Sequence, residues 1–187
     1  MKTSCGVRAE HTVLCMGVGG LGLNGVAIAK RCLSARCVIA CDIRAVALED
    51  ALAAGADYAV HPDQLSALIG EKKLAIDFAF DFVGVQTTFE ACFAAIRPGG
   101  TIHVVGLGAS ALTYTHLTVM RKDLTLKTSF WGTQTEVAEI LQAISDGLLE
   151  PKVATRPMSE CAQVLNEMRE GKLQARIALV PDSADEY

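Results

Sequence analysis

Three glycines near the beginning of the chain are spaced as in a loop that binds phosphate. Gly17, Gly19 and Gly22 follow an apolar run and open a helix-compatible stretch at residues 21–33. Glycine allows a sharp turn and lets the backbone come close to a ligand. Amide groups in the first turn of a helix favour an anion. The spacing therefore predicts a loop that holds phosphate groups between a buried strand and a helix.

An acidic residue stands at the end of the next apolar run. Asp42 closes the run at residues 37–42, about twenty residues after the loop, where a carboxylate can accept hydrogen bonds from ribose hydroxyls. Strand, glycines, helix, strand and acid in this order predict a dinucleotide site. In it Gly17 makes the tight turn, Gly19 admits the pyrophosphate, and Gly22 lets helix and sheet pack closely. The alternative is an ordinary glycine turn with an incidental surface aspartate.

Asp42 also bears on the choice of coenzyme. The 2'-phosphate of NADP would lie against this carboxylate, and two unit charges about 4 Å apart repel by roughly 4 kcal/mol at an effective dielectric constant near 20. Arg44 is close by in the sequence and offers a partner for a phosphate. NAD is therefore the predicted coenzyme, and NADP is the less favoured one.

Composition and charge exclude several classes of function. The chain has 187 residues and is 51% hydrophobic, which is enough for a continuous core. Its net charge of -4 comes without a basic run, so no nucleic-acid partner is predicted. No apolar segment reaches the roughly 20 residues of a membrane span, and the N-terminus lacks the core of a signal peptide. We expect a soluble, cytoplasmic protein without a membrane partner.

The cysteines and histidines do not form a metal-binding pattern. The seven cysteines include no CxxC pair and lie mostly in apolar runs, as core residues of a protein in a reducing compartment do. Cys32, Cys37 and Cys41 come closest to a cluster, but no histidine stands near them at ligand spacing. The four histidines are scattered. Neither a metal site nor a catalytic residue is predicted in this chain.

Strand-length and helix-length segments alternate along the chain, which is typical of a parallel sheet covered on both faces. Strands are expected at residues 12–17, 37–42, 58–60, 75–82, 101–106 and 124–129. Helices are expected at residues 21–33, 45–54, 62–70, 87–96 and 135–147. The predicted fold is an α/β Rossmann fold with a doubly wound, six-stranded parallel sheet.

The C-terminal part departs from this alternation. A short run at residues 152–155, an amphipathic helix at 159–170 and a run at 174–180 predict a small α/β extension. The expected organisation is a dinucleotide-binding domain at residues 8–131, a C-terminal extension at 132–181 and a flexible tail at 182–187.

The ordered motifs give the chain a family resemblance. Besides the glycine loop, the matching segments are residues 54–57, 77–84, 98–100, 104–107, 127–132 and 171–180. With these segments the chain resembles the coenzyme-binding, C-terminal half of medium-chain, zinc-type alcohol dehydrogenases. The resemblance covers nearly the whole chain and carries no information about a particular substrate.

The resemblance implies a set of coenzyme contacts. It places Phe82 and Val83 on the adenosine side, the residues around Gly106 at the nicotinamide, and Arg176 at the pyrophosphate. Trp131 could equally be a core aromatic residue, and Arg176 a solvated charge on a terminal strand. The cofactor-binding residues expected from motif and resemblance together are Gly17, Gly19, Gly20, Leu21, Gly22, Asp42, Phe82, Val83, Val105, Gly106, Leu107, Ser129, Trp131 and Arg176.

The resemblance also implies what this chain lacks. Enzymes of that family hold a catalytic zinc with Cys and His residues of an N-terminal domain, and no such ligands can be matched here. The implied activity is hydride transfer between an alcohol or aldehyde substrate and NAD in an intact enzyme, with zinc only in the missing catalytic domain. This chain alone is expected to bind coenzyme without turnover. Its extension would pack on that domain.

The resemblance further implies a homo-oligomer formed through the edge of the sheet. The expected edge strand runs over residues 104–107 and continues through 112–117.

Two other functions remain open from the sequence. One is a naturally short, NAD-binding regulatory module, which would share the glycine loop. The other is an S-adenosylmethionine-dependent methyltransferase, since a glycine loop followed by an acidic strand end also suits that ligand. The spacing of the glycines and the Pro-Gly-Gly run at residues 98–100 argue against the methyltransferase.

Overall fold

The computed structural model describes residues 6–173 and 176–182 and divides into two compact units. The first unit ends at Leu149 and the second begins at Glu150. The first unit therefore extends beyond residue 131, where the dinucleotide-binding domain was expected to end, and includes the helix α6 (Gln134–Ser145). Residues 183–187 of the expected tail lie outside the described residues.

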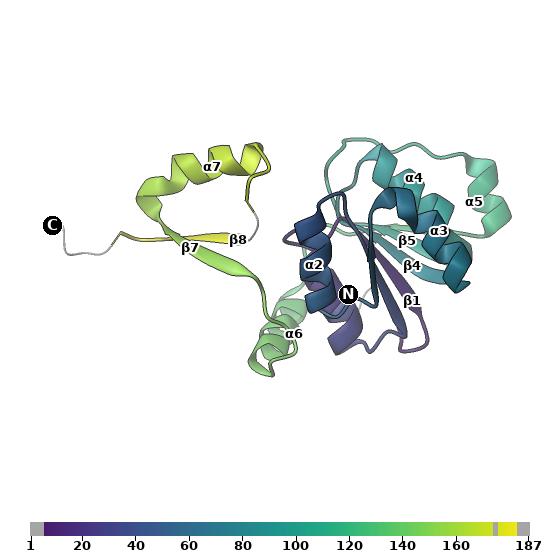
Figure 1. The fold of residues 1–187 in the computed structure, drawn as a ribbon, viewed down its shortest axis with the longest axis horizontal. Helices are drawn as coiled ribbons and strands as arrows, with labels where there is room; N and C mark the ends of the chain where they lie inside the picture. The colour runs from purple at the N-terminus through teal and green to yellow at the C-terminus, as the bar shows by residue number, and fades with distance from the viewer. Residues whose placement is uncertain (1–5, 174–175, 183–187) are drawn as a thin grey trace. The chain divides into compact units, whose positions relative to one another are not determined.

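A six-stranded parallel sheet forms the centre of the first unit (Figure 1). Its strands lie in the order β3-β2-β1-β4-β5-β6, so the winding reverses between β1 and β4. This arrangement confirms the predicted doubly wound Rossmann fold. The strands are β1 (Thr12–Met16), β2 (Cys37–Cys41), β3 (Tyr58–Val60), β4 (Ile76–Asp81), β5 (Ile96–Val104) and β6 (Thr125–Thr128).

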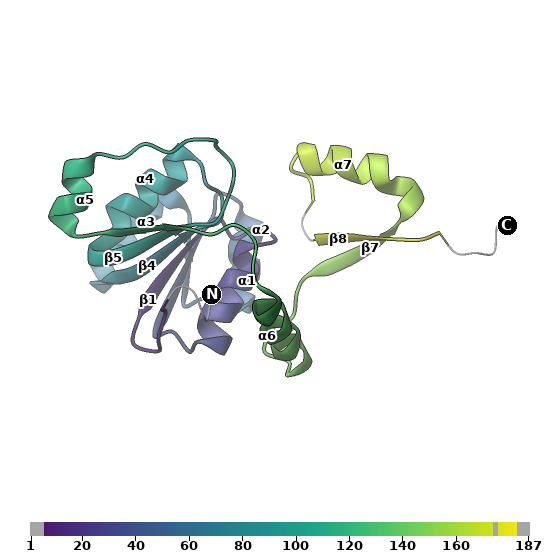
Figure 2. The same cartoon turned by 180° about the vertical axis from the view of Figure 1, so that it is seen from behind.

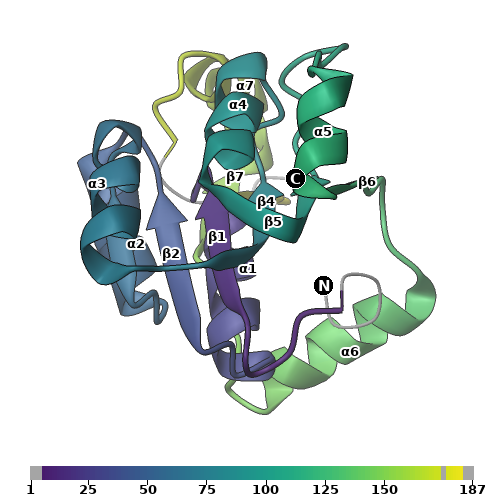
Figure 3. The ribbon, with the colours of Figure 1, turned by 90° about the vertical axis from the view of Figure 1, so that its right-hand side faces the viewer.

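Helices cover both faces of this sheet (Figure 3). Successive side chains of β1 point to opposite faces: Val13 and Cys15 pack with α1 and α2, whereas Leu14 and Met16 pack with α3 and α4. All four are essentially inaccessible to solvent. The helices are α1 (Gly22–Ala27), α2 (Ala45–Ala53), α3 (Pro62–Lys72), α4 (Gln86–Ala95) and α5 (His116–Lys122).

The sheet cysteines belong to this core, as expected. Cys15, Cys37, Cys41 and Cys92 are buried. Burial raises the pKa of Cys15 and of Cys41 to about 12, so these thiols stay protonated at neutral pH. They act as small apolar residues.

The helix expected at residues 21–33 consists of two parts. α1 ends at Ala27, and a π-helix continues from Ile28 to Cys32. The wider turn is visible in the bond from the Leu33 amide to the Ile28 carbonyl, which spans five residues at 3.0 Å. The first helix of the fold is therefore continuous but changes its winding after its first turns.

The prediction of an edge strand at residues 104–107 and 112–117 was wrong. Val104 ends β5, and β6 pairs with β5 on the outer side, so β5 is an interior strand. Residues 112–115 form no strand, and residues 116 and 117 are the first residues of α5. Contacts between residues distant in the sequence hold this segment as a helix, because the Lys122 ammonium at the end of α5 donates to the carbonyls of Phe93 and Ile96 at the end of α4.

The second unit contains a two-stranded parallel sheet and a helix. β7 (Val153–Pro157) pairs with β8 (Arg176–Val180), and a 3-10 turn (Met158–Glu160) leads into α7 (Cys161–Arg169). Arg156 of β7 forms ion pairs with Glu160 and Glu167, which connect the sheet to this helical segment. The predicted extension therefore has the expected order of strand, helix and strand.

Candidate coenzyme-binding site

Most of the predicted site residues lie on loops at one edge of the sheet. β1, β2, β4, β5 and β6 all end at this edge because they are parallel. The loops that follow them carry twelve of the fourteen predicted cofactor-binding residues; Gly22 is the first residue of α1, and Arg176 lies in β8. In doubly wound sheets, ligands bind outside the carboxyl ends of the strands where the strand order reverses. Here the strand order reverses between β1 and β4.

Gly17 makes the sharp turn after β1 that the sequence predicted. Its φ is +80°, and a Cβ built on it would lie 2.2 Å from Cγ2 of Val83. Its amide donates to the carbonyl of Cys41 at 2.8 Å. Only glycine combines this backbone conformation with such close contact to the loop after β4.

Close packing between helix and sheet depends on two glycines rather than one. A Cβ at Gly22 would lie 2.0 Å from the Gly17 carbonyl oxygen, so this residue mainly lets the turn close. A Cβ at Gly25 would lie 2.4 Å from Cζ of Phe82. Sequence analysis missed Gly25, although its position one helical turn after Gly22 was an available signal.

The backbone between Gly17 and Gly22 can face a ligand. Gly20 and Leu21 are exposed, and Gly19 is half-buried. Among the described residues, none accepts a hydrogen bond from the amides of Gly19, Gly20 or Leu21. Their position at the start of the helical segment suits phosphate oxygens.

Asp42 lies directly beside the glycine loop. Its carboxylate is buried and accepts a hydrogen bond of 2.9 Å from the Val18 amide, which joins the ends of β1 and β2. The guanidinium of Arg44 binds both carboxylate oxygens. This pairing raises the pKa of Arg44 above its ordinary value.

A second buried carboxylate, which the sequence analysis did not single out, organises the loop after β4. Asp81 is fully buried, and one of its oxygens accepts hydrogen bonds of 2.9 Å from the amides of Val83 and Gly84. Its other oxygen accepts from the Thr88 hydroxyl in α4. The available signal was an acidic residue at the end of an apolar strand, the same signal that identified Asp42.

The loops after β4 and β5 pack backbone against backbone. A Cβ at Gly106 would lie 2.2 Å from the carbonyl carbon of Val83, and one at Gly84 would lie 2.1 Å from the Gly106 oxygen. Val105 packs against the core, whereas Leu107 is exposed. The structure thus brings Val83 and Gly106 together.

Ser129 and Trp131 follow β6 but differ in their surroundings. Ser129 contacts Nε2 of His103 from β5 at 2.5 Å. Trp131 has a φ of +64° and is 86% exposed, so it is no core residue of this unit. Its ring meets that of Phe130 edge-on.

Arg176 belongs to the second unit, where it begins β8 and is exposed. Its amide donates to the Lys152 carbonyl at 3.1 Å. The contact that the resemblance implies between Arg176 and the pyrophosphate remains a prediction.

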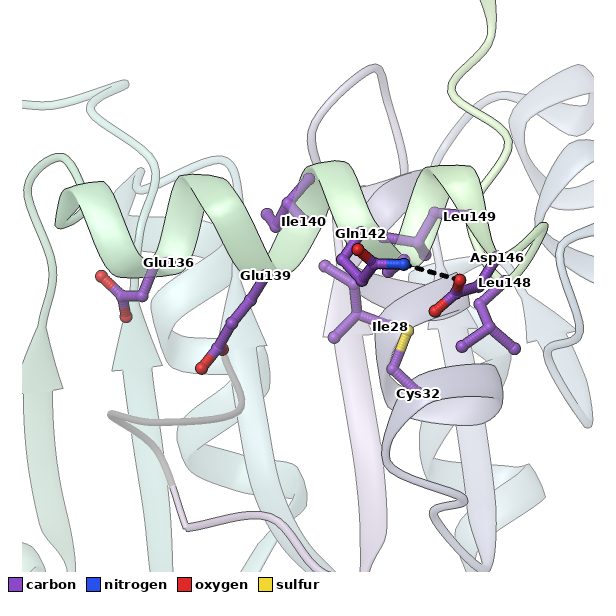
Figure 4. Close-up of a pocket in the computed structure, with 10 residues that line it drawn as sticks. Ile28, Cys32, Glu136, Glu139, Ile140, Gln142, Asp146, Leu148 and Leu149 are labelled. Carbon is purple, nitrogen blue, oxygen red and sulfur yellow. Dashed lines mark hydrogen bonds between the residues drawn. The ribbon is translucent and has the colours of Figure 1, made fainter.

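A groove elsewhere in the first unit has a different character. Figure 4 shows Ile140 of α6 and Leu149 facing Ile28 and Cys32 of the helical segment after β1. Figure 2 shows α6 and α1 near each other at this place. The groove is also lined by three acidic residues, Glu136, Glu139 and Asp146. Apolar walls with acidic neighbours do not suit a pyrophosphate.

The described residues provide no centre for a metal ion. No group of three or more His, Cys, Asp or Glu side chains in residues 6–173 and 176–182 is arranged to hold one. Within the same ranges, no helix is long and apolar enough to cross a membrane.

Comparison with known proteins defines the family. The profile of the family described as zinc-binding dehydrogenase matches residues 20–146, which is more than half of the chain. The chain therefore belongs to the zinc-binding dehydrogenases, and the predicted resemblance to the coenzyme-binding part of that family is confirmed.

Individual relatives agree with this assignment. An alcohol dehydrogenase from Geobacillus stearothermophilus is 29% identical over 93% of this chain and 51% of its own length. An NAD-dependent alcohol dehydrogenase from Saccharolobus solfataricus is 26% identical over 91% of this chain and 50% of its own. The structure of acetophenone reductase from Geotrichum candidum in complex with NAD matches with a TM-score of 0.84 and 26% identity, covering 100% of this chain and 52% of that one. The chain spans about half the length of these oxidoreductases.

The family implies two bound groups, a dinucleotide and a zinc ion, and the described residues fit only the first. The carboxyl edge of the sheet has glycines where a side chain would fill the turn, exposed backbone beside them and a buried carboxylate, which suits a dinucleotide. Zinc has no matching set of ligands among the described residues, so no chemistry of this chain is derived through it.

Proposed function

We propose that this chain binds NAD at the carboxyl edge of its sheet and serves as the coenzyme-holding part of an alcohol or polyol dehydrogenase. One observation carries the proposal. The turn at Gly17 lies where the strand order reverses between β1 and β4, and the buried carboxylate of Asp42 after β2 is joined to the same loop by the 2.9 Å bond from the Val18 amide. The family supports this assignment, and so do relatives whose names include NAD.

In this proposal each part of the edge binds one part of the coenzyme. Asp42 accepts the hydroxyls of the adenosine ribose, and the amides from Gly19 to Leu21 face the pyrophosphate. Phe82 and Val83 border the adenosine side. The nicotinamide lies against the loops after β5 and β6, at Val105, Gly106, Leu107, Ser129 and Trp131.

NAD, when bound, accepts the hydride from the alcohol. The protein's part is to bind the coenzyme, to orient its nicotinamide ring and to shield one of its faces. Activation of the alcohol needs a further group that stabilises the alkoxide. The described residues do not provide this group, so we propose that it belongs to the remainder of an intact enzyme and that this chain alone binds coenzyme without turnover.

We further propose that residues 132–181 contact a catalytic domain in the intact enzyme. α6 supports this, because none of its residues is buried and its apolar side chains Val137, Ile140 and Leu141 remain exposed. The intact enzyme is proposed to self-associate through an edge of its sheet; the edge strand next to β5 is β6 rather than the segment expected from the sequence.

Thermal unfolding tests the coenzyme proposal directly. The chain is unfolded with NAD, NADP or S-adenosylmethionine at equal concentrations. A ligand at a hundred times its dissociation constant adds about 2.7 kcal/mol, and each kcal/mol raises the midpoint of a domain of this size by roughly 2–4 °C. We expect the larger shift with NAD. Absence of a shift with both nicotinamide coenzymes would refute the proposal.

A turnover assay tests whether this chain binds coenzyme without catalysing alcohol oxidation. With NAD, zinc and simple primary and secondary alcohols, we expect no formation of NADH, monitored by its absorbance. Reproducible NADH formation by the purified chain would show that it contains its own means of activating an alcohol.

A further inference from the structure

His103 lies on β5 just inside the carboxyl edge of the sheet, beside residues that the proposed function assigns to the nicotinamide. The register pairs His103 with Lys127 of β6. Because side chains two residues apart in a strand share a face, Val105 lies on the same face as His103. Ser129 lies on this face too, since it follows Lys127 by two residues and its amide continues the ladder to the Val104 carbonyl at 3.3 Å. The structure thus places a buried histidine directly next to Ser129.

The two ring nitrogens of His103 have different surroundings. The ring is buried and lies against the Phe80 ring of β4, with 5.4 Å between the centroids. Its Nε2 contacts the Ser129 Oγ at 2.5 Å. Its Nδ1 is enclosed and, in the part of the chain that the structure describes, has no hydrogen-bond partner. The hydrogen bonding of the ring is therefore directed at the Ser129 hydroxyl.

These surroundings decide which nitrogen carries the proton. Burial, with a smaller contribution from the charge of Lys127, lowers the pKa of His103, so the ring is neutral at neutral pH. A neutral imidazole has one N–H donor and one bare acceptor nitrogen. In protein interiors an N–H group without a partner is rarer than an acceptor without one. The proton therefore belongs on Nε2, and the bare Nδ1 faces the interior.

We infer that His103 is a positioning residue for the coenzyme: it fixes the Ser129 hydroxyl as a hydrogen-bond donor for the carbonyl oxygen of the nicotinamide carboxamide. The inference rests on the proposed function, which assigns the nicotinamide to the loops after β5 and β6. The bond from Nε2 occupies an acceptor site of Oγ, so the O–H is directed away from the ring. Accepting this bond also polarises the hydroxyl and strengthens it as a donor. In the other tautomer Ser129 would be an acceptor and would favour the amide NH2 of the carboxamide.

The first test needs no coenzyme. Long-range 1H–15N NMR spectra distinguish the protonated nitrogen from the bare one in each of the four histidine rings of the chain. The signals missing from His103→Phe identify those of His103. We expect the proton on Nε2 at neutral pH. A proton on Nδ1 would overturn the inference.

The sheet offers a matched control at its opposite edge. His11 precedes β1, is half-buried and lies against Phe78 of β4, with 4.9 Å between the ring centroids. Its Nδ1 accepts a bond of 2.9 Å from the Arg8 amide. His11→Phe therefore replaces a histidine beside a phenylalanine of β4, as His103→Phe does, but at the amino edge of the sheet. It should leave coenzyme binding unchanged.

Isothermal titration calorimetry measures the dissociation constant for NADH of the full chain and of each variant that unfolds cooperatively. Ser129→Ala should bind NADH about 5-fold more weakly, the scale of one hydrogen bond between neutral groups. His103→Phe keeps a ring against Phe80 but has no donor, so we expect a loss of about 3-fold. His103→Gln should stay within about 2-fold of wild type, because its amide N–H can donate to the hydroxyl as Nε2 does.

A double variant shows whether the two residues act together. His103→Phe combined with Ser129→Ala should bind NADH no more weakly than Ser129→Ala alone, because no hydroxyl remains to be positioned. If the two losses add, the residues act independently and the inference is wrong.

The 3-acetylpyridine analogue of NADH tests the direction of the bond. It keeps the carbonyl oxygen and has a methyl group in place of the amide NH2. Ser129→Ala should weaken binding of the analogue as much as binding of NADH. A loss confined to NADH would mean that Ser129 accepts a bond from the NH2, which contradicts the inference.

The outcomes separate the inference from the proposed function. If wild type does not bind NADH, the proposed function fails and the inference fails with it. If wild type binds NADH but His103→Phe binds it no more weakly than His11→Phe, the proposed function stands and the inference is overturned. If His103→Phe does not unfold cooperatively, His103→Gln takes its place in assigning the spectrum. The ring spectrum and the two ligands with Ser129→Ala then decide.

Discussion

Asp42 and Asp81 have comparable positions at the ends of two parallel strands. Each carboxylate is buried and accepts hydrogen bonds from amides of loops at the carboxyl edge of the sheet. Asp42 was predicted as a ligand for ribose, and the structure adds that it holds the Val18 amide. A carboxylate that binds loop amides fixes the backbone before a ligand arrives, which lowers the cost of binding.

His103 gives a residue-scale prediction about pH. It is buried in β5, and its Nδ1 has no hydrogen-bond partner among the described residues. Burial, with a smaller contribution from the charge of Lys127, lowers the pKa of His103 below its ordinary value. The unfolded chain therefore takes up a proton that the folded chain refuses. We expect the contribution of His103 to the free energy of unfolding to be fully present above the ordinary histidine pKa, about 6.5, and to be lost as the pH drops below it.

Urea unfolding over the range from neutral to mildly acidic pH measures this effect. His103→Phe keeps a ring against Phe80, which lies 5.4 Å from the histidine ring, and should remove part of the decrease in stability at low pH. His61→Asn is the control, because His61 is a half-exposed cap of α3 and asparagine can take that role. An identical pH dependence in His103→Phe and wild type would contradict the role assigned to burial.

At the scale of elements, the distance between α1 and β4 is set by glycine. A Cβ at Gly25 would lie 2.4 Å from the ring of Phe82. We expect Gly25→Ala to destabilise the chain by about 1–3 kcal/mol, the usual cost of overpacking. Denaturant unfolding measures the loss, and Phe82→Leu in the same chain should recover part of it because the smaller side chain leaves room.

Gly70→Ala is the matched control for this substitution. Gly70 lies in α3, and a Cβ there would meet nothing within 4 Å. Alanine in a helix is more favourable than glycine by roughly 0.5–1 kcal/mol, so this variant should be as stable as wild type or more so. If Gly25→Ala matched Gly70→Ala, helix and sheet would not be in the close contact described.

Local pattern was sufficient to predict most elements of the sheet. β1, β2 and β4 are apolar runs between turn residues, and their starts and ends lie within one residue of the expected positions. α5 was missed because residues 112–117 were expected in an edge strand, and this short helix has no buried residue that would give it an apolar face. Its position depends on the contact of Lys122 with the end of α4, which joins residues distant in the sequence.

At the scale of the whole molecule, Arg176 is the proposed coenzyme residue that belongs to the second unit. If it pairs with the pyrophosphate, Arg176→Ala should weaken NADH binding by about 10-fold or more, as the loss of a charge-assisted hydrogen bond does. The salt dependence of binding should also become shallower. Arg169→Ala is the control, since Arg169 is an exposed arginine of the same unit that contacts Asn166. Unchanged binding by Arg176→Ala would remove Arg176 from the site.

The sequence alone was sufficient for the class of fold, the family and the position of the glycine loop. These features depend on local rules: apolar runs form strands, Gly17 permits a turn, and an acid ends the second strand. Only the folded chain shows that Gly25, more closely than Gly22, packs against Phe82 and that Asp81 binds the amides of the loop after β4. It also shows that Arg44 occupies the acceptors of Asp42. The contact of Gly25 with Phe82 joins segments that are distant in the sequence. The bonds of Asp81 and Asp42 join near neighbours, but they depend on the burial of each carboxylate, which the packing of the sheet decides.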